Sequence, residues 1–82
     1  MTERIHAFDV VRHFKGNNYL VLTTDAHWHE GGERLVVYRS YANGRICVRP
    51  YEMFVSEVDR EKYPEAPQRF RFEVVSQQQD KR

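Results

Sequence analysis

The sequence of 82 residues has little of three things: cysteine, net charge and long apolar runs. Its single cysteine, Cys47, cannot form an internal disulfide, so the hydrophobic core must hold the fold, as in proteins of the reducing cytoplasm. No apolar run approaches the roughly 18 residues of a membrane helix, and no signal-peptide pattern opens the chain. Thirteen basic and twelve acidic side chains argue against a general polyanion-binding protein. We therefore expect one small cytoplasmic domain with no membrane partner.

The residues that are present favour β structure. Val, Ile, Thr, Tyr, Phe and Trp, which suit a pleated and half-buried surface, number 26, whereas Leu, Ala and Met number only 9. A helical bundle of this size would need nearly the opposite ratio. Eleven aromatic side chains provide much of the area that so short a chain can bury.

Alternation of apolar and polar residues places the expected strands. Gly16, Gly31 and the Asn43-Gly44 pair interrupt the alternation with turn chemistry, and Asn43-Gly44 predicts a type I′ hairpin turn. Pro50 is expected to end a strand and to open a single helical turn near residues 50–54. The predicted strands cover residues 10–14, 19–28, 34–41, 45–49, 54–58 and 68–75.

These short strands predict an all-β fold, a single SH3-like antiparallel barrel or roll of five to six strands. The domain is expected to span residues 1–75, with 1–8 as an extended lead-in held by Ile5 and Phe8, and with a surface loop over 59–68. Residues 76–82 contain no apolar side chain and predict a disordered tail. A half-open β-sandwich is the alternative, but closing the sheet would remove edges that so small a domain cannot cover.

Two segments, RHFKG at residues 12–16 and VRPYEMF at residues 48–54, occur in order along the chain. Together with Tyr19 and the strand at residues 35–38, they resemble a family of small, mostly bacterial proteins known only as a domain of unknown function. The resemblance implies an SH3-like β-roll and no assigned activity. Trp28-His29-Glu30 stands where the family tends to have His-Ser-Glu, and Cys47 stands where it commonly has an aromatic residue.

The segment around Pro50 carries the clearest structural motif. Arg49 and Glu52 flank this proline, and an Arg–carboxylate contact between them would fix a corner of the barrel. Recognition of a ligand carboxylate by Arg49 is the alternative. Gly16 is expected to be a turn glycine rather than part of a phosphate-binding loop.

The aromatic excess favours a binding module that recognises a protein or a peptide. Exposed aromatic side chains mark recognition surfaces, and a core of this size has limited room for eleven rings. The expected groove residues are Tyr19, Trp28, Tyr38, Tyr41 and Tyr51.

Single-stranded nucleic acid is the alternative partner, since small barrels bind it through basic side chains and stacked aromatics. Self-association through an exposed strand edge also stays open. The anion-binding set for this alternative is Arg12, Lys15, Arg39, Arg45 and Arg49.

Metal and enzyme chemistry form a third and weaker hypothesis. His27 and His29 would share one face of a strand, but two histidines fall short of the three or four ligands that zinc needs. Cys47 with His13 is the one nucleophile–base pair, and a mid-strand thiol is typical of a buried apolar residue. A barrel of this size has little room for a catalytic pocket. We expect no cofactor and no enzymatic activity.

Overall fold

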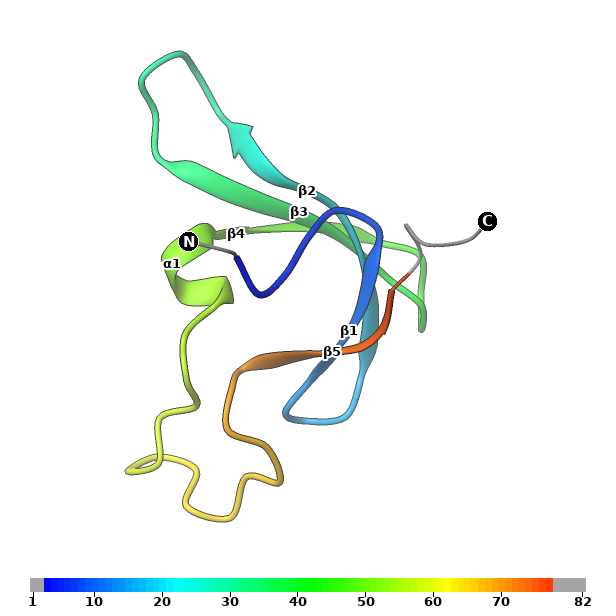
Figure 1. Ribbon diagram of the computed structural model, residues 1–82, viewed down its shortest axis with the longest axis vertical. Coiled ribbons are helices and arrows are strands. Elements are labelled where there is room, and N and C mark those ends of the chain that lie inside the picture. The colour runs from blue at the N-terminus through cyan, green and yellow to red at the C-terminus, as the bar shows by residue number, and fades with distance from the viewer. Residues whose placement is uncertain (1–2, 78–82) are drawn as a thin grey trace.

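A computed structural model describes residues 3–77 (Figure 1). The described chain folds into one sheet and one short helix. In order these elements are β1 (Asp9–His13), β2 (Asn18–His27), β3 (Arg34–Ser40), β4 (Ile46–Pro50), the helix α1 (Tyr51–Phe54) and β5 (Phe72–Gln77).

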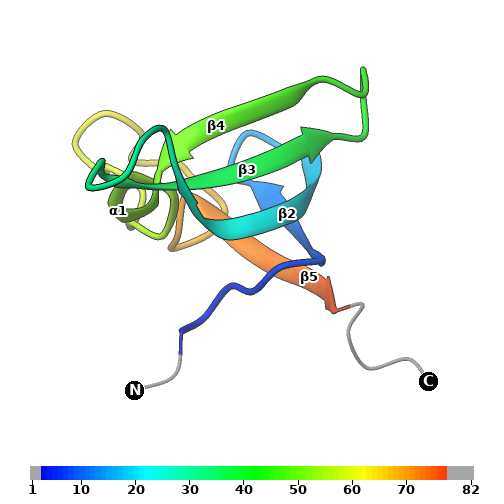
Figure 2. The same cartoon turned by 90° about the horizontal axis from the view of Figure 1, so that it is seen from above.

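The sheet has the order β4-β3-β2-β1-β5, and every pair of neighbouring strands is antiparallel. It curls into a roll, which confirms the predicted all-β architecture (Figure 2). The roll does not close, because β4 and β5 are not paired with each other. Register shifts in β1–β5 and in β2–β3 mark the irregularities at which the strands bend. Within residues 3–77, the two edge strands β4 and β5 each have one side without a neighbouring strand.

The concave face of the roll holds an aromatic core centred on Phe72. This ring stacks on Phe54 with centroids 4.1 Å apart, and Tyr38 lies edge-on at 5.5 Å. All three side chains are buried, and so are the valines at the centres of the first three strands. Alternation explains this placement, since successive residues of a strand point to opposite faces. The buried valines are Val11, Val21 and Val36.

Arg4 and Ile5 pack where the segment after α1 meets the start of β5. Ile5 is fully buried in the core, as predicted. The Arg4 guanidinium donates to the carbonyl oxygens of Phe72 (2.8 Å) and Val55 (3.1 Å), and it lies 3.9 Å from the centre of the Phe70 ring. The Arg4 side chain thus strengthens a contact that the isolated Glu57–Phe70 bridge also makes.

The predicted anchoring role of Phe8 is wrong, because this side chain is exposed. Phe8 has φ of +71°, a left-handed conformation that bulky residues rarely adopt. The turn is held by the Phe8 N–H, which donates to the Val21 carbonyl (2.7 Å), and by the buried Asp9 carboxylate, which accepts the His6 N–H (2.9 Å). These bonds turn the chain into β1 and leave the Phe8 ring in solvent.

β4 ends at Pro50, as predicted, but the proline is itself the last residue of the strand, opposite Leu35. The Ser40 N–H donates to the Arg45 carbonyl (2.9 Å), so Arg45 bonds to β3. Alternate residues of an antiparallel strand bond to the same neighbour, which leaves Ile46, Val48 and Pro50 turned toward the free edge. The missing N–H of Pro50 therefore costs the ladder nothing, and the proline precedes α1 rather than occupying its first position.

Two of the other predicted boundaries also need correction. The strand expected over residues 54–58 is an isolated bridge between Glu57 and Phe70, because Phe54 belongs to α1. The last strand begins at Phe72 and runs to Gln77, so residues 76 and 77 of the expected tail lie in β5. The rest of that tail, residues 78–82, lies outside the described residues.

The hairpin expected at Asn43-Gly44 is confirmed, but its turn is not type I′. A type I′ turn needs positive φ at both central residues, and of these two only Gly44 has it (+72°). The loop is longer, and the Gly44 N–H donates to the Ser40 carbonyl (2.8 Å). The Asn43 side chain instead accepts the Arg45 N–H (2.9 Å).

Candidate functional site

The two segments RHFKG and VRPYEMF meet in space around Phe72. His13, at the end of β1, lies edge-on to the Phe72 ring at 4.9 Å. Arg49 of β4 reaches the same ring from the other side of the roll, with its guanidinium carbon 5.7 Å from the centroid. His13 is opposite Phe72 in the β1–β5 ladder, and Arg49 points inward because it is opposite the buried Val36.

Arg49 is half-buried and is held by groups that carry no charge. Its Nε donates to the Tyr38 hydroxyl (3.1 Å), and Nη1 lies 3.4 Å from the Met53 sulfur. The expected ion pair with Glu52 does not form within the described chain: Glu52 is exposed on α1, whereas Arg49 faces the concave side. The Arg49 charge is therefore left without a carboxylate among residues 3–77.

The pKa of His13 is lowered by burial and by three nearby positive charges. Burial, followed in order of effect by the nearby charges of Arg49, Arg71 and Lys15, lowers its pKa from 6.5 to about 4. The ring is thus neutral near pH 7. Its Nδ1 accepts the Lys15 N–H (3.1 Å), which places the remaining proton on Nε2. We call His13, Lys15, Arg49 and Arg71 the cationic cluster.

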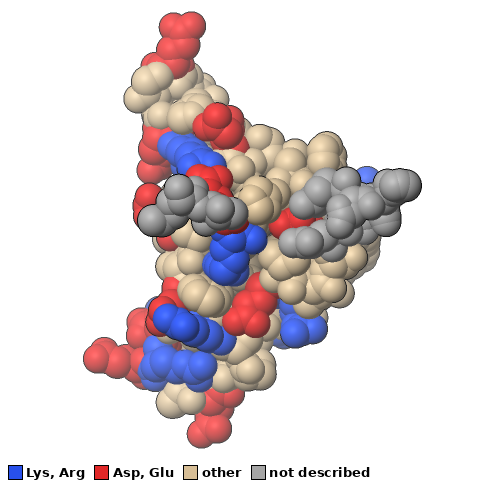
Figure 3. Space-filling view, viewed as in Figure 1, with Lys and Arg blue, Asp and Glu red and all other residues tan. Residues whose placement is uncertain are grey.

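The cationic cluster differs from the other arginines of the described chain, which are paired or lie apart. Arg34 forms a bidentate bond with Glu3 (2.9 and 3.0 Å), and Arg69 binds Glu57 (2.9 Å). The face in Figure 3 likewise shows acidic and basic side chains interspersed. Within residues 3–77, no carboxylate lies within 4 Å of the side-chain nitrogens of Lys15, Arg49 or Arg71. The cationic cluster therefore offers hydrogen-bond donors and positive charge, and it lacks an internal anion.

The titration of His13 tests this arrangement. We expect its ring to stay neutral down to pH about 4, far below the ordinary value of 6.5. Because the unfolded chain takes up this proton first, the folded state should lose stability as the pH falls from 6.5 toward 4. Replacing Arg49 by glutamine removes one nearby charge and should raise the pKa. The measurement is an NMR pH titration of the His13 ring, and a midpoint near 6.5 in the wild type would contradict the geometry.

The structure does not favour the Cys47–His13 pair as a catalytic unit. Cys47 is half-buried on the concave face and packs against the core. No hydrogen bond joins its sulfur to His13, whose Nδ1 is already engaged with the Lys15 N–H. The thiol therefore lacks a base at hydrogen-bond distance within the described chain.

The five predicted groove residues do not line one surface. Tyr38 is buried, and Tyr19 packs against it at 5.2 Å, so both rings belong to the core side. Tyr51 lies on α1 beneath the Arg34 guanidinium, 3.7 Å away. Trp28 (71% exposed) and Tyr41 (60%) are in solvent, but they lie in loops at opposite ends of β3. The chain thus provides two separate exposed rings rather than a continuous groove.

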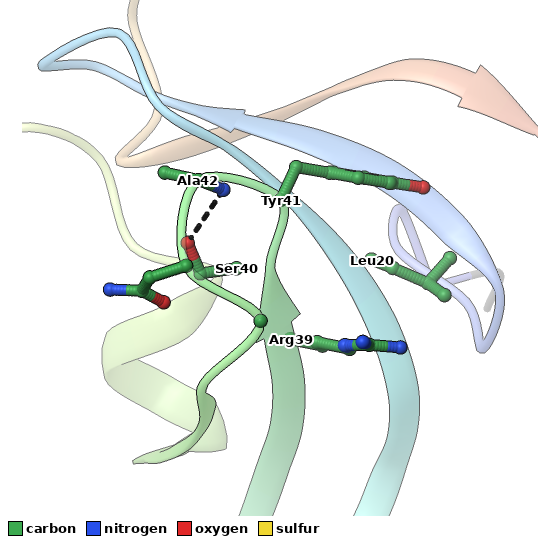
Figure 4. A pocket seen from close by; sticks show the side chains of 7 residues that line it. Leu20, Arg39, Ser40, Tyr41 and Ala42 are labelled. Atoms are coloured by element: carbon green, nitrogen blue, oxygen red, sulfur yellow. Dashed lines mark hydrogen bonds between the residues drawn. The ribbon is translucent and has the colours of Figure 1, made fainter.

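The five basic residues predicted to bind an anion also lie on different parts of the surface. Lys15 and Arg49 belong to the cationic cluster, whereas Arg12 is exposed on β1 and contacts Gln68 (3.4 Å). Arg39 lies on the outer face, where it and Tyr41 extend on either side of Leu20 (Figure 4). These three line an open pocket of about 490 Å³. Arg45 follows the same loop and is exposed.

The histidine pair lies at the tip of the β2–β3 hairpin. β2 ends at His27, so His29 belongs to the turn and the two rings do not share a strand face. Both ring nitrogens of His27 face acceptors, the Gly32 carbonyl (2.8 Å) and the Asp25 carboxylate (2.9 Å). These two bonds raise the pKa of His27, with the carbonyl as the larger cause. Among residues 3–77, no three His, Cys, Asp or Glu side chains are grouped as a metal ion would require.

Comparison with known protein families gives one match. The family model described as "Protein of unknown function (DUF1653)" matches residues 9–74, most of the chain. The chain belongs to this family. No curated protein and no solved structure matches it. The range shared with DUF1653 includes β1, β4 and the start of β5, and therefore every residue of the cationic cluster.

Sequence reasoning missed one member of the cluster in this DUF1653 protein. Arg71 falls within the strand predicted over residues 68–75, where alternation would turn it away from Phe70 and Phe72. The strand instead begins at Phe72, and the Phe14 N–H donates to the Arg71 carbonyl (3.0 Å), beside His13. The Arg71 side chain lies near Ser56, with Nε 3.5 Å from its hydroxyl. No local pattern in the sequence signals this approach, because it depends on the path of the 55–71 segment.

The one helix of the described DUF1653 chain is short. Over residues 3–77, α1 is a single turn, and no helix is both long and apolar enough to cross a membrane.

Proposed function

We propose that this protein is a binding module that recognises an acidic segment of a partner protein through the cationic cluster. One arrangement carries the proposal. Arg49 and His13 both lie against the Phe72 ring, and the charges of Lys15 and Arg71 are close enough to help lower the pKa of His13. Within residues 3–77, no carboxylate lies within 4 Å of these three cationic side chains. Peptide recognition by aromatic side chains alone has less support, because the predicted rings are dispersed.

The chemistry of the cluster suits a carboxylate. Arg49, Lys15 and Arg71 present only donors, and His13 adds an Nε2–H in its neutral form. A guanidinium can bind a carboxylate through two parallel hydrogen bonds, and such a bond is stronger where water is partly excluded. The Tyr38 hydroxyl and the Met53 sulfur hold the Arg49 guanidinium in place before a ligand arrives, which reduces the entropy lost on binding.

A local site also agrees with the overall charge. Proteins that bind nucleic acid chiefly through phosphates use many cations along the strand, and this chain has a net charge of only +1. Among the other cations of residues 3–77, Arg34 and Arg69 are paired with carboxylates, and Arg39 lies on the outer face. An acidic peptide segment needs only the three cations of the cluster.

Single-stranded nucleic acid is the second candidate, and one observation favours it. The Lys15 ammonium lies 5.1 Å from the centre of the Tyr63 ring, and Tyr63 packs against Phe14 at 4.9 Å. Cations beside aromatic rings are typical of sites where bases stack and phosphates are neutralised. However, Phe14 is buried and Tyr63 half-buried, so little of either ring is free for stacking.

A titration with labelled hexaglutamate distinguishes the two candidates. We expect hexaglutamate to bind at low salt and to weaken as salt is added, because screening reduces the attraction between charges. Fluorescence anisotropy measures the affinity, hexaglutamine is the uncharged control of equal length, and a ten-nucleotide oligothymidylate represents nucleic acid. Tighter binding of the oligonucleotide would favour the second candidate. Failure of both probes to bind would contradict both functions.

A further inference from the structure

The free edge of β4 has backbone groups ready for pairing. β4 has β3 on one side and, among residues 3–77, no strand on the other (Figure 2). Ile46 and Val48 hold the positions whose N–H and C=O point away from β3, as the Ser40–Arg45 hydrogen bond fixes by alternation. Edge strands are usually protected by charge, by proline or by a covering segment. Here the first protecting residue on the outward positions is Pro50, which ends the available edge.

The side chains of β4 differ on its two faces. Ile46 (63% exposed) and Val48 (59%) lie on the outer face beside the half-buried Val37. Arg45, Cys47 and Arg49 alternate with them on the concave face. A strand laid against β4 would therefore meet apolar side chains on one face and arginines on the other.

We propose that the acidic segment recognised by the cationic cluster is an extended strand that pairs antiparallel with β4. This inference rests on the proposed function and specifies the partner: apolar side chains alternate with acidic ones. The apolar residues lie opposite Ile46 and Val48, and their backbone groups bond to these two residues. The acidic residues point to the concave face, where the Arg49 guanidinium has no carboxylate partner within residues 3–77 and where Arg45 lies four residues earlier in the chain.

Charge complementarity distinguishes this partner from a second copy of the chain. Two antiparallel copies of β4 would bring the Arg45 and Arg49 of both chains to the same face. Like charges opposite one another in a ladder are destabilising, whereas acidic side chains there are attracted. Antiparallel pairing agrees with every other ladder of this sheet.

A labelled peptide of sequence acetyl-Thr-Glu-Val-Glu-Val-Glu-Thr-amide tests the inference by fluorescence anisotropy. In an antiparallel pair, the valine amides face β4 and the glutamate amides face away. N-methylation of the two valines should weaken binding by about tenfold or more, because it removes hydrogen bonds to the edge. N-methylation of two glutamates should leave the affinity within about twofold. Equal effects of the two modifications would overturn strand addition.

A protein variant provides a second, independent test. Val48→Lys should weaken binding of the same peptide by about fivefold or more, through loss of the apolar contact on the outer face. The added positive charge would attract an acidic peptide, so repulsion cannot explain a loss. Val75→Lys on β5 is the matched control, since Val75 is also exposed (42%) and the charge change is the same.

The two proposals can fail separately. If Arg49→Gln weakens peptide binding while Val48→Lys and valine methylation do not, strand addition is wrong and acid recognition stands. If hexaglutamate binds but the alternating peptide binds no better, strand addition is also wrong. If Arg49→Gln leaves the affinity for both peptides unchanged, the proposed function itself fails.

Discussion

Replacing Phe72 by alanine should lower the free energy of unfolding by about 3–5 kcal/mol. Phe72 is fully buried, and its ring contacts Phe54, Tyr38 and His13 at centroid distances of 4.1, 5.5 and 4.9 Å. The ring also joins β5 to α1 and β3, which no strand pairing joins. Its loss would leave a cavity in the aromatic core, where β5 contacts α1 and β3 through side chains.

Equilibrium unfolding in urea measures this effect, and Val75→Ala is the control. Val75 is on the same strand but is exposed, so the control should change stability by less than about 1 kcal/mol. A domain of this size has only about 5–10 kcal/mol of stability, so Phe72→Ala should remove about a third or more of it and lower the urea midpoint accordingly. A loss similar to that of Val75→Ala would show that the aromatic core does not hold the roll together.

Arg49→Gln should weaken binding of an acidic peptide by about 1.5–3 kcal/mol, which is roughly a 10- to 150-fold loss of affinity. The half-buried guanidinium is already oriented by the Tyr38 hydroxyl, so its positive charge acts where water is partly excluded. Glutamine keeps a polar side chain but removes the charge and the paired donors. Titration calorimetry with hexaglutamate measures the difference.

Arg39→Gln is the matched control for that experiment. It removes the same charge from the outer face of β3, away from the concave side on which Arg49 lies. A loss of affinity of equal size in both variants would mean that binding responds to net charge alone. Urea unfolding of both variants then separates a loss of binding from a loss of folding.

Much of the fold follows from local patterns in the sequence. The alternation of Val36 and Tyr38 with outward residues placed β3 correctly, and Gly44 marked the following hairpin. The type of that turn could not be predicted from the sequence. Asparagine can adopt positive φ, as a type I′ turn requires, or accept a backbone N–H with its side chain, as Asn43 does from Arg45. The segment after Pro50 was ambiguous for a similar reason. Phe54 fits either a strand or a helical turn, and its packing on Phe72 decides between them.

The candidate site was harder to predict than the fold. The sequence indicated that Arg49 has a role, and it offered a ligand carboxylate as one alternative. The prediction that Glu52 pairs with Arg49 was wrong. β4 ends at Pro50, and Glu52 lies two residues later in α1, where its side chain is exposed to solvent. The meeting of His13, Arg49 and Arg71 depends on how the roll curls, which the order of residues does not specify. Tyr38 shows the same limit, because an aromatic residue in a strand can lie on either face.

NMR mapping of hexaglutamate on the isotopically labelled protein tests the central claim most directly. We expect the largest chemical-shift changes at the backbone amides of His13, Lys15, Arg49 and Arg71 and at the Nε–H of Arg49. These changes should saturate together and should diminish with added salt. Changes centred instead on Arg39 and Tyr41, or spread evenly over all basic residues, would contradict recognition at the cationic cluster.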